Sequence, residues 1–477
     1  MKTVIMREFL SENIFDYFNN GQMSVTKSEL IQTPTTRISL RRNDDLDLIF
    51  EFTSRMPIID RPEQYPAGTV RSADETIEFR HSAGPIASAR GVIDRGIRSC
   101  RAADGQTETV QTYSAHSIEL DLQRPVQPAY VVEWILNIPD GYIWPEPVRF
   151  KSIETSTKSV GAGEAEIQMN ASSETGGGGL ALHLRISGVD LYVMPSIDKS
   201  ERDKKPGQIV YRGCPSQEFR DKVRTCVSFV LGKPIVYLGH TEYCHDWQPT
   251  SMRSVDALSF GGAAFKLPDL PPYPISDPRY ENVLDPKRVA DMVEILLKNF
   301  DAIKFNEVSW TYWHAVLAPI HAAAGQFGSL IEQLQNNYNK ATGATRGKLL
   351  PEETWNALNS TIQCWLKTTQ LELDVRTILE GKVSSLNQAP QNLILERLLD
   401  TLGLAIGEVE TKSWKHRNMS AHGGISDSPI DAILNSKILK ILFHRMLAGI
   451  TKCSDRYIDY YNLRLPIRRL PESVPRR

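Results

Sequence analysis

An arginine, an asparagine and a histidine lie close together near the C-terminal end of the chain, in the last turn of a predicted helix. Asn418 follows Arg417 directly, and His422 comes five positions after the arginine. The double glycine 423–424 ends the helix, so His422 lies at the negative end of the helix dipole. That position favours the imidazolium form and brings its titration towards neutral pH. A near-neutral acid–base group beside a fixed cation suits phosphodiester cleavage.

The residues before this trio make the segment locally basic, although the chain as a whole has a net charge of −2. Lys412 and Lys415 are positively charged at neutral pH, and His416 can accept a proton. We expect these side chains to contact a phosphate-bearing substrate. Trp414 has a ring on which a base can stack, although an aromatic residue at helical spacing is more often a core or dimer contact.

Arg417 and His422 point in different directions on an ideal helix, because positions five apart differ by about 140° around the axis. They form one tight pair only if the end of the helix unwinds. A groove between two copies around a two-fold axis collects both side chains more easily. We therefore expect a homodimer, or a higher even oligomer, with a shared site.

Residues 285–463 are predicted to form the helical bundle that holds this stretch. The segments with helical spacing are 288–303, 307–339, 351–365, 371–383 and 393–404. The second contains Pro319, where it either kinks or divides into two helices. The fifth is expected either to end near 404 or to continue through Gly403 and Gly407 into the basic stretch.

A capping box starts the last helix of the predicted bundle. Ser428 is the cap, Pro429 takes the first helical position, and Asp431 follows. The residues after 463 are rich in arginine, and we expect 464–477 to be a basic C-terminal tail.

Residues 1–270 alternate between apolar and polar side chains instead of following a helical period. Strands are predicted at 37–41, 46–53, 76–80, 117–122, 130–136 and 180–186. One helix, 216–231, is expected among them, with Ser216 as its cap and Gly232 as its end. The glycine-rich segment 161–179 lacks the following Lys-Ser/Thr of a P-loop, so we interpret it as a hairpin tip. The fold is therefore predicted to be α+β and multidomain, with a sandwich-like or bent sheet followed by a bundle.

The proline-rich stretch 271–284 is predicted to be a linker between the two domains. Neither a secretory signal nor a long apolar segment is found, so we expect a cytoplasmic protein without a membrane span. No cofactor motif is identified. The spacing of Cys214, Cys226, Cys244 and His245 matches no compact zinc module, and we leave zinc binding open.

The arrangement Arg417-Asn418-x-x-x-His422 before a glycine, late in a helical bundle, resembles the Arg-x4–6-His motif of the HEPN superfamily. A β-rich N-terminal domain before such a bundle resembles the ApeA-like proteins of bacterial anti-phage defence. Residues 327–334 resemble the early HEPN helix, and Glu332 is similar to an acidic residue that some HEPN nucleases carry there. Residues 228–238 resemble a segment of the N-terminal domain of such proteins.

The resemblance implies metal-independent RNA cleavage that leaves a 2′,3′-cyclic phosphate and a 5′-hydroxyl. His422 would be the general acid or base, Arg417 would stabilise the transition state, and Asn418 would orient the phosphate or the histidine. The substrate would be single-stranded or loop RNA, with transfer RNA as one candidate. The N-terminal domain would sense a phage component, and cleavage would then stop growth in abortive infection.

Two other functions remain open from the residues alone. In the first, the bundle only dimerises or binds nucleotides, without catalysis. In the second, the β-rich domain binds a carbohydrate or another ligand through Trp134, Trp144, Trp247 and the glycine-rich segment, and the bundle is accessory.

Overall fold

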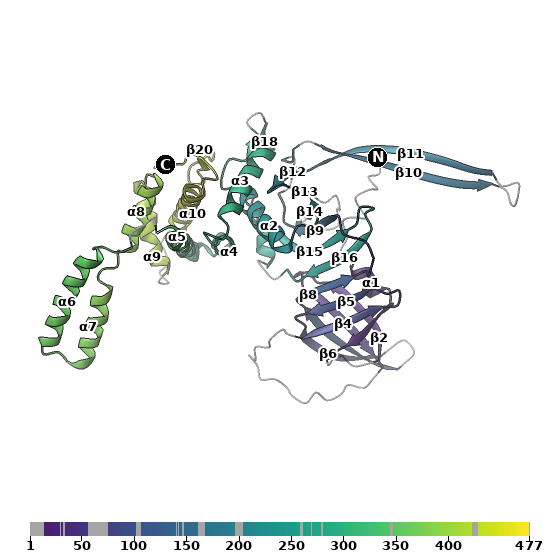
Figure 1. Cartoon of the computed structure of the whole chain (residues 1–477), viewed down its shortest axis with the longest axis horizontal. Coiled ribbons are helices and arrows are strands. Elements are labelled where there is room, and N and C mark those ends of the chain that lie inside the picture. Colours follow the sequence, from purple (N-terminus) through teal and green to yellow (C-terminus); the bar gives the residue numbers. More distant parts are fainter. Residues whose placement is uncertain are drawn as a thin grey trace. The chain divides into compact units, whose positions relative to one another are not determined.

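The computed structural model divides the chain into two compact units, which are described separately. Unit 1 contains residues 1–270 and 275–290, and unit 2 contains 271–274 and 291–477. The residues that the structure describes are 14–28, 30–31, 34–55, 75–101, 106–139, 141, 143–145, 147–160, 167–195, 204–257, 261–268, 270–277, 280–343, 347–421 and 428–476. Unit 1 is rich in β-strands and the rest of the chain is mainly helical, so the predicted α+β architecture is confirmed (Figure 1).

Two antiparallel sheets make up most of the described part of unit 1. In spatial order, the larger sheet has β1 (Met23–Lys27), β4 (Thr76–His81), β5 (Ile86–Arg90), β8 (Ser117–Asp121), β16 (Pro249–Val255), β15 (Val236–Tyr243), β9 (Tyr130–Leu136), β14 (Gly207–Arg212), β13 (Val189–Pro195) and β12 (Leu182–Ile186). The smaller sheet has β2 (Thr35–Arg42), β3 (Leu48–Ser54), β7 (Thr107–Ala115) and β6 (Ile93–Arg101). All six strands predicted from alternation are present.

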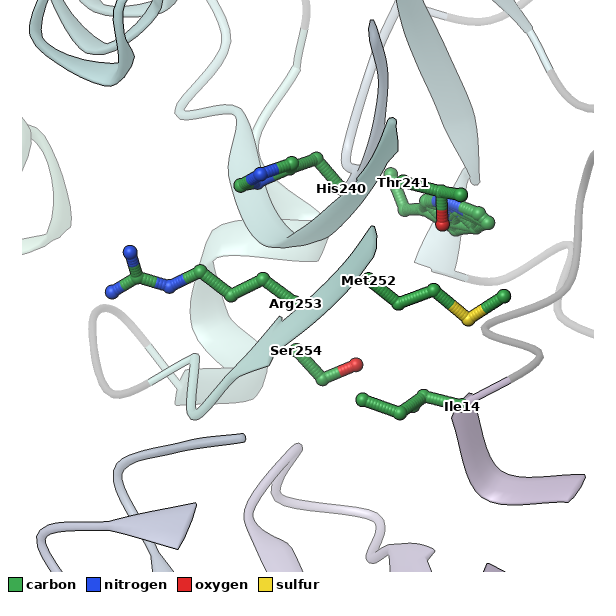
Figure 2. A pocket seen from close by; sticks show the side chains of 7 residues that line it. Ile14, His240, Thr241, Met252, Arg253 and Ser254 are labelled. Atoms are coloured by element: carbon green, nitrogen blue, oxygen red, sulfur yellow. The ribbon is translucent and has the colours of Figure 1, made fainter. Parts of the chain in front are cut away.

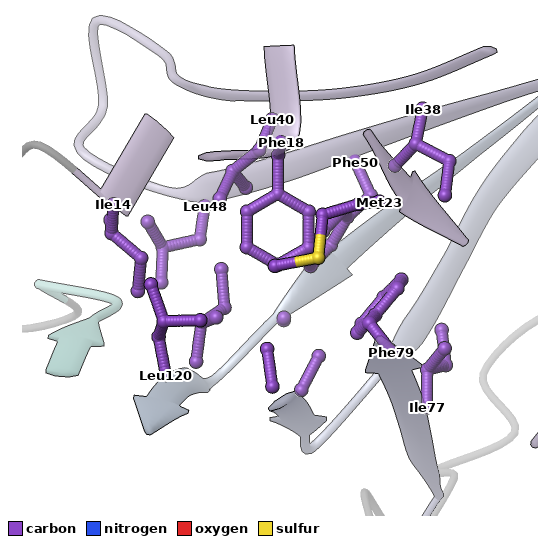
Figure 3. Close-up of a cluster of buried hydrophobic side chains, with 14 of the residues drawn as sticks. Ile14, Phe18, Met23, Ile38, Leu40, Leu48, Phe50, Ile77, Phe79 and Leu120 are labelled. Atoms are coloured by element: carbon purple, nitrogen blue, oxygen red, sulfur yellow. The ribbon is translucent and has the colours of Figure 1, made fainter. Parts of the chain in front are cut away.

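A buried apolar cluster joins the two sheets into a sandwich (Figure 3). It also includes the short helix α1 (Ile14–Asn19), which contributes Ile14 and Phe18. Inward-facing residues of both sheets supply the rest, among them Leu40, Phe50, Phe52, Tyr113, Phe79 and Leu120. Alternation is what brings these side chains to one face, because successive residues of a strand point to opposite sides.

Helix α2 (Gln217–Leu231) confirms the predicted helix among the strands. The Ser216 side chain accepts a hydrogen bond from Phe219 N, and Gly232 ends the helix with a left-handed φ of 71°. Ion pairs hold this helix in place, in addition to its buried apolar side chains. Fully buried Glu133 of β9 pairs with Arg220 at 3.2 Å and with Arg224 at 2.8 Å.

His240 of β15 lies beside this buried ion network, 3.3 Å from an Arg220 nitrogen through its Nε2. Burial and the nearby arginines lower the pKa of His240 to about 3. His240 and Arg253 point to one side of β15 and β16, while Thr241 and Met252 point to the other (Figure 2). The pocket that these residues line has roughly the room of one water molecule, too little for a substrate.

Strands β10 (Pro147–Val160) and β11 (Ile167–Leu180) form a long two-stranded ribbon. The sequence predicts a hairpin tip for the glycine-rich segment, but Gly176–Gly179 lie in β11 and pair with Val148–Lys151. Extended backbone is open to every residue, so glycine does not exclude a strand where a facing strand supplies the hydrogen bonds. Residues 161–166, between the two strands, lie outside the described part.

Unit 2 and the segment leading into it contain helices α3 to α10. They are α3 (Pro286–Asn299), α4 (Phe305–Leu317), α5 (Ile320–Thr342), α6 (Glu352–Thr368), α7 (Leu373–Ser385), α8 (Gln391–Leu402), α9 (Glu408–Ala421) and α10 (Pro429–Thr451). Pro319 separates α4 from α5, so the segment is two helices and not one kinked helix. Ser428 caps α10 as expected, accepting a hydrogen bond from Asp431 N.

The α8 helix does not continue into α9. Gly403 takes a left-handed φ of 68° and its N–H bonds back to Asp400 and Leu399, which ends α8. Gly407 N then donates to Glu410 Oε2 at 2.7 Å, which satisfies one free donor at the start of α9.

The segments expected to be linker and tail pack against other parts of the protein. Tyr273 is buried and donates to His444 O at 2.9 Å, while 275–290 cluster with unit 1. In the C-terminal segment, β20 (Ile467–Arg469) pairs with β19 (Arg456–Ile458), and Arg468 bonds to buried Asp459 at 2.7 Å. Within the described residues, no helix combines the length and apolarity needed to cross a membrane.

Candidate active site

Helix α9, which carries Arg417, is fixed at its start by a fully buried ion pair. Glu410 pairs with Arg445 of α10, and neither side chain is exposed. Arg445 also donates to Ala405 O at 2.8 Å, just before α9 begins. Burial raises the pKa of the Glu410 carboxyl, and the Arg445 guanidinium opposes that rise. The position of α9 against α10 therefore depends on this pair.

The middle of α9 packs through two further contacts. Ser413 Oγ lies 2.9 Å from Asn435 Oδ1 of α10 and donates to it. Trp414 is buried. Its ring therefore supports the interior of the bundle, as an aromatic residue at helical spacing most often does, and does not offer a surface on which a base can stack.

Arg417 is held in a defined position although it is one turn from the end of α9. Its guanidinium lies 3.6 Å above the Trp414 ring, and its Nη1 is 2.6 Å from Glu332 Oε1 of α5. The residue is only 8% exposed. Burial lowers the pKa of the Arg417 guanidinium, and Glu332 partly offsets that effect. Arginine nevertheless stays charged at any physiological pH.

Gly328 of α5 provides the room for the Arg417 side chain. A Cβ at this position would lie 2.7 Å from Arg417 Cδ, closer than real carbon contacts allow. A glycine inside a helix costs about 1 kcal/mol relative to alanine, so its presence in α5 has a packing reason. No sequence motif pointed to Gly328. The available signal was its spacing of four from Glu332, which places both on one helix face.

The remaining basic residues of α9 lie on a different side of the helix. Lys412 and Lys415 are exposed, and His416 is partly buried. Lys412 and Lys415 are about 140° and 160° from Arg417 around an ideal helix. One phosphate bound by Arg417 is therefore out of reach of both lysines in the same chain.

Two members of the predicted trio are beyond what the structure describes. The backbone of Asn418 belongs to α9, but its side chain is not described, and His422 lies in the gap 422–427 between α9 and α10. Of the eight predicted site residues, the structure brings together Glu332, Trp414 and Arg417.

The residues behind the other hypotheses do not gather into a site. Among the described residues, no three His, Cys, Asp or Glu side chains are placed to hold a metal ion. Cys226 is buried in α2, whereas Cys214 is exposed. Trp134 and Trp144 are buried in unit 1, and the Trp247 ring stacks on Tyr130 at 4.6 Å.

The arrangement at Arg417 can stabilise negative charge. Its Nη1 is occupied by Glu332, and its Nε is buried with no hydrogen-bond acceptor among the described residues. A fixed cation with a free donor stabilises a developing oxyanion without having to reorganise. Comparison with known proteins adds no assignment: no family model matches the chain, and neither a curated protein nor a solved structure matches it.

Proposed function

We propose that this protein is a metal-independent endoribonuclease with Arg417, Asn418 and His422 as its catalytic residues. One observation carries the proposal: Arg417 is buried and fixed by Glu332 and Trp414 immediately before the end of α9. A surface arginine without a function gains nothing from such support, because desolvating a guanidinium is costly. Five positions further on, His422 supplies an acid–base group.

The proposed reaction needs one proton removed and one donated. The ribose 2′-oxygen attacks the adjacent phosphorus while a base takes the hydroxyl proton. The bond from phosphorus to the 5′-oxygen breaks, and an acid protonates that leaving oxygen. His422 takes one of these two roles, Asn418 orients the phosphate or the histidine, and Arg417 binds the charge that develops on the non-bridging oxygens. The products are a 2′,3′-cyclic phosphate and a 5′-hydroxyl.

Unpaired RNA suits this reaction, because in-line attack needs a backbone that an A-form duplex does not offer. We further propose that the protein acts in the cytoplasm in anti-phage defence, and that unit 1 senses a phage component before cleavage causes abortive infection. Transfer RNA is a candidate substrate. These parts of the proposal rest on the likeness to HEPN proteins and not on any residue of unit 1.

Purified protein incubated with total RNA in EDTA tests the proposal. We expect wild-type protein to cut RNA and leave cyclic-phosphate ends. Arg417→Ala and His422→Ala are each expected to lower the cleavage rate by about 100-fold or more, as loss of a charge-stabilising donor or an acid–base group does. Glu332→Gln should cause a smaller loss, because Glu332 positions Arg417 and does not touch the substrate.

Lys415→Ala is the matched control, since Lys415 is an exposed cation on the same helix but faces away from Arg417. A comparable loss in Lys415→Ala would indicate general RNA binding, and not catalysis by Arg417. RNA that stays intact with wild-type protein, even when phage lysate is supplied as trigger, would favour the alternative of a non-catalytic dimerisation or nucleotide-binding bundle. Cleavage that EDTA abolishes would reject the metal-independent reaction.

A further inference from the structure

Gln335 of α5 has a fully buried side-chain amide that makes no hydrogen bond within the part of the chain that the structure describes. The residue is 0% exposed, and neither its Oε1 nor its Nε2 has a partner there. Burying such an amide costs free energy, because the group gives up its hydrogen bonds to water and gains none in return. Buried polar groups in folded proteins are nearly always paired, so this exception needs a physical reason.

A second buried amide on the same helix shows what a structural role requires. Asn337 Nδ2 donates to Ile303 O at 3.0 Å, which ties α5 to the segment between α3 and α4. Gln335 points about 160° away from Asn337 around an ideal helix, so it takes no part in that contact. The two amides are therefore a matched pair, one with a structural partner and one without.

Gln335 lies on the face of α5 that the Arg417 side chain covers. Around an ideal helix, Gln335 is about 20° from Gly328, and Glu332 is about 40° from Gly328 on the other side. The Arg417 side chain packs against Gly328, and its Nη1 is 2.6 Å from Glu332 Oε1. Helical side chains lean back over the preceding turn, so the Gln335 amide is directed towards the turn that carries Glu332.

The unpaired atoms of Gln335 and Arg417 are complementary. Arg417 Nε is a buried donor with no acceptor among the described residues, and Gln335 Oε1 is a buried acceptor with no donor among them. Glu332 is paired with Nη1 alone. A second acceptor at Nε would fix the plane of the guanidinium, because a rigid fork of donors that is held at two points does not rotate. Hydrogen bonds of this kind are often open in a free enzyme and close when substrate binds.

We propose that Gln335 is a positioning residue for Arg417, whose Nε donates to Gln335 Oε1 when the phosphate of the substrate is bound. This role rests on the nuclease activity proposed above and adds a residue to the same site. With Glu332 at Nη1 and Gln335 at Nε, the donors of Nη2 stay available to a phosphate oxygen. Because Gln335 is fully buried, it acts through Arg417 and does not touch RNA. An amide that destabilises the free protein is then retained for activity, as is common at functional sites.

Gln335→Met of the full chain tests this role, because methionine is unbranched like glutamine and accepts hydrogen bonds only weakly. We expect two opposite effects. Hydrogen exchange of α5 peptides should slow by roughly tenfold, because an unpaired buried amide has been removed. The kcat for RNA cleavage should fall by roughly tenfold with little change in KM, because Arg417 acts on the transition state. Asn337→Leu is the matched control, and it should speed exchange in α5 and leave the kcat of the folded protein unchanged.

A double-variant cycle separates positioning from a structural effect. In an Arg417→Ala background, Gln335→Met should cause no further loss of cleavage, because its effect passes through Arg417. A further loss in that background, or faster exchange of α5 in Gln335→Met alone, overturns the proposal and makes Gln335 a structural residue. Full cleavage by Gln335→Met also overturns it, while the nuclease itself stands. RNA that wild-type protein leaves intact removes the proposed nuclease, and the role of Gln335 with it.

Discussion

Helix α9 takes part in two carboxylate–arginine pairs that differ in how completely the protein closes them. In the pair of Glu410 with Arg445, both side chains are fully buried, and Arg445 also donates to backbone oxygens of Ala405 and Leu470. In the pair of Arg417 with Glu332, the Glu332 side chain is 29% exposed and Arg417 Nε has no acceptor among the described residues.

The difference separates an ion pair whose guanidinium donors are all used from one that leaves a guanidinium donor without an acceptor among the described residues. A guanidinium whose donors are all used cannot bind an incoming anion without losing a partner. The Arg417 guanidinium keeps one buried donor, Nε, without an acceptor among the described residues, and its counter-ion Glu332 is partly exposed. The closed pair fixes the start of α9, and the open pair lies one turn from its end. The same helix is therefore anchored at one end by the closed pair, and near its other end it carries the arginine that we propose for catalysis.

Removing one member of the closed pair should have the largest effect on stability. Arg445→Met leaves Glu410 as a buried charge without its partner, and we expect a loss of about 3–5 kcal/mol. Because the chain has two units, hydrogen exchange of peptides from α9 and α10 is the appropriate measurement. Replacing both members, as Glu410→Leu with Arg445→Met, should recover much of the loss.

Arg476→Met provides the control for this prediction. Arg476 pairs with Glu408 of the same helix, but both side chains are mostly exposed. Such a pair contributes less than about 1 kcal/mol. If Arg445→Met proved as mild as Arg476→Met, the closed pair would not be what anchors α9.

Unit 1 also contains a fully buried ion network, formed by Glu133, Arg220 and Arg224. The histidine beside this network should make unit 1 sensitive to acid. His240, next to Arg220, has its pKa lowered to about 3. The unfolded chain binds a proton at this histidine below about pH 6.5, whereas the folded chain does not. The contribution of His240 to the free energy of unfolding is therefore fully present above that pH, and it falls by about 1.4 kcal/mol for each pH unit below it. Between pH 8 and pH 5 the loss is about 2 kcal/mol.

The urea midpoint of unit 1, measured at both pH values, gives this dependence. His240→Gln should reduce the slope, since glutamine does not titrate. His183→Gln provides a control for replacing a histidine elsewhere in the same sheet, where the side chain is half exposed. A slope that persists in His240→Gln would place the acid sensitivity elsewhere in unit 1.

Much of the fold follows from local patterns that the sequence shows directly. Alternation located strands such as β9, and Ser216, Pro319 and Ser428 marked helix ends because each acts on its immediate neighbours. The order of strands was not predictable. β9 lies between β14 and β15 because of pairing with segments far along the chain, which no local pattern encodes.

The candidate site likewise contains one residue that a local pattern indicates and partners that only the folded chain brings to it. Arg417 was found from its spacing to His422, which is a local feature. Its partner Glu332 was suggested only by the likeness to an early HEPN helix, and the two are 85 residues apart in the chain. The pair of Glu410 with Arg445 gave no signal at all, because a charged residue in a helix is usually on the solvent side. Burial decides which ion pairs hold the helices in place, and burial is a property of the folded chain.

A pair of glycine substitutions tests whether Gly328 of α5 helps to set the position of the Arg417 side chain. Gly381 of α7 has free space around its Cβ position, so Gly381→Ala should stabilise its helix by about 1 kcal/mol. Gly328→Ala offers the same gain in propensity, but its Cβ would collide with Arg417 Cδ. We expect no net gain there, and a loss of RNA cleavage as Arg417 moves away from Glu332. Hydrogen exchange of α5 and α7 gives the stabilities, and the cleavage assay gives the activity. If both substitutions raised helix stability equally and the protein kept full activity, the Arg417 side chain would have shifted to accommodate the new Cβ. Glu332 and Trp414 would then fix Arg417 without help from Gly328.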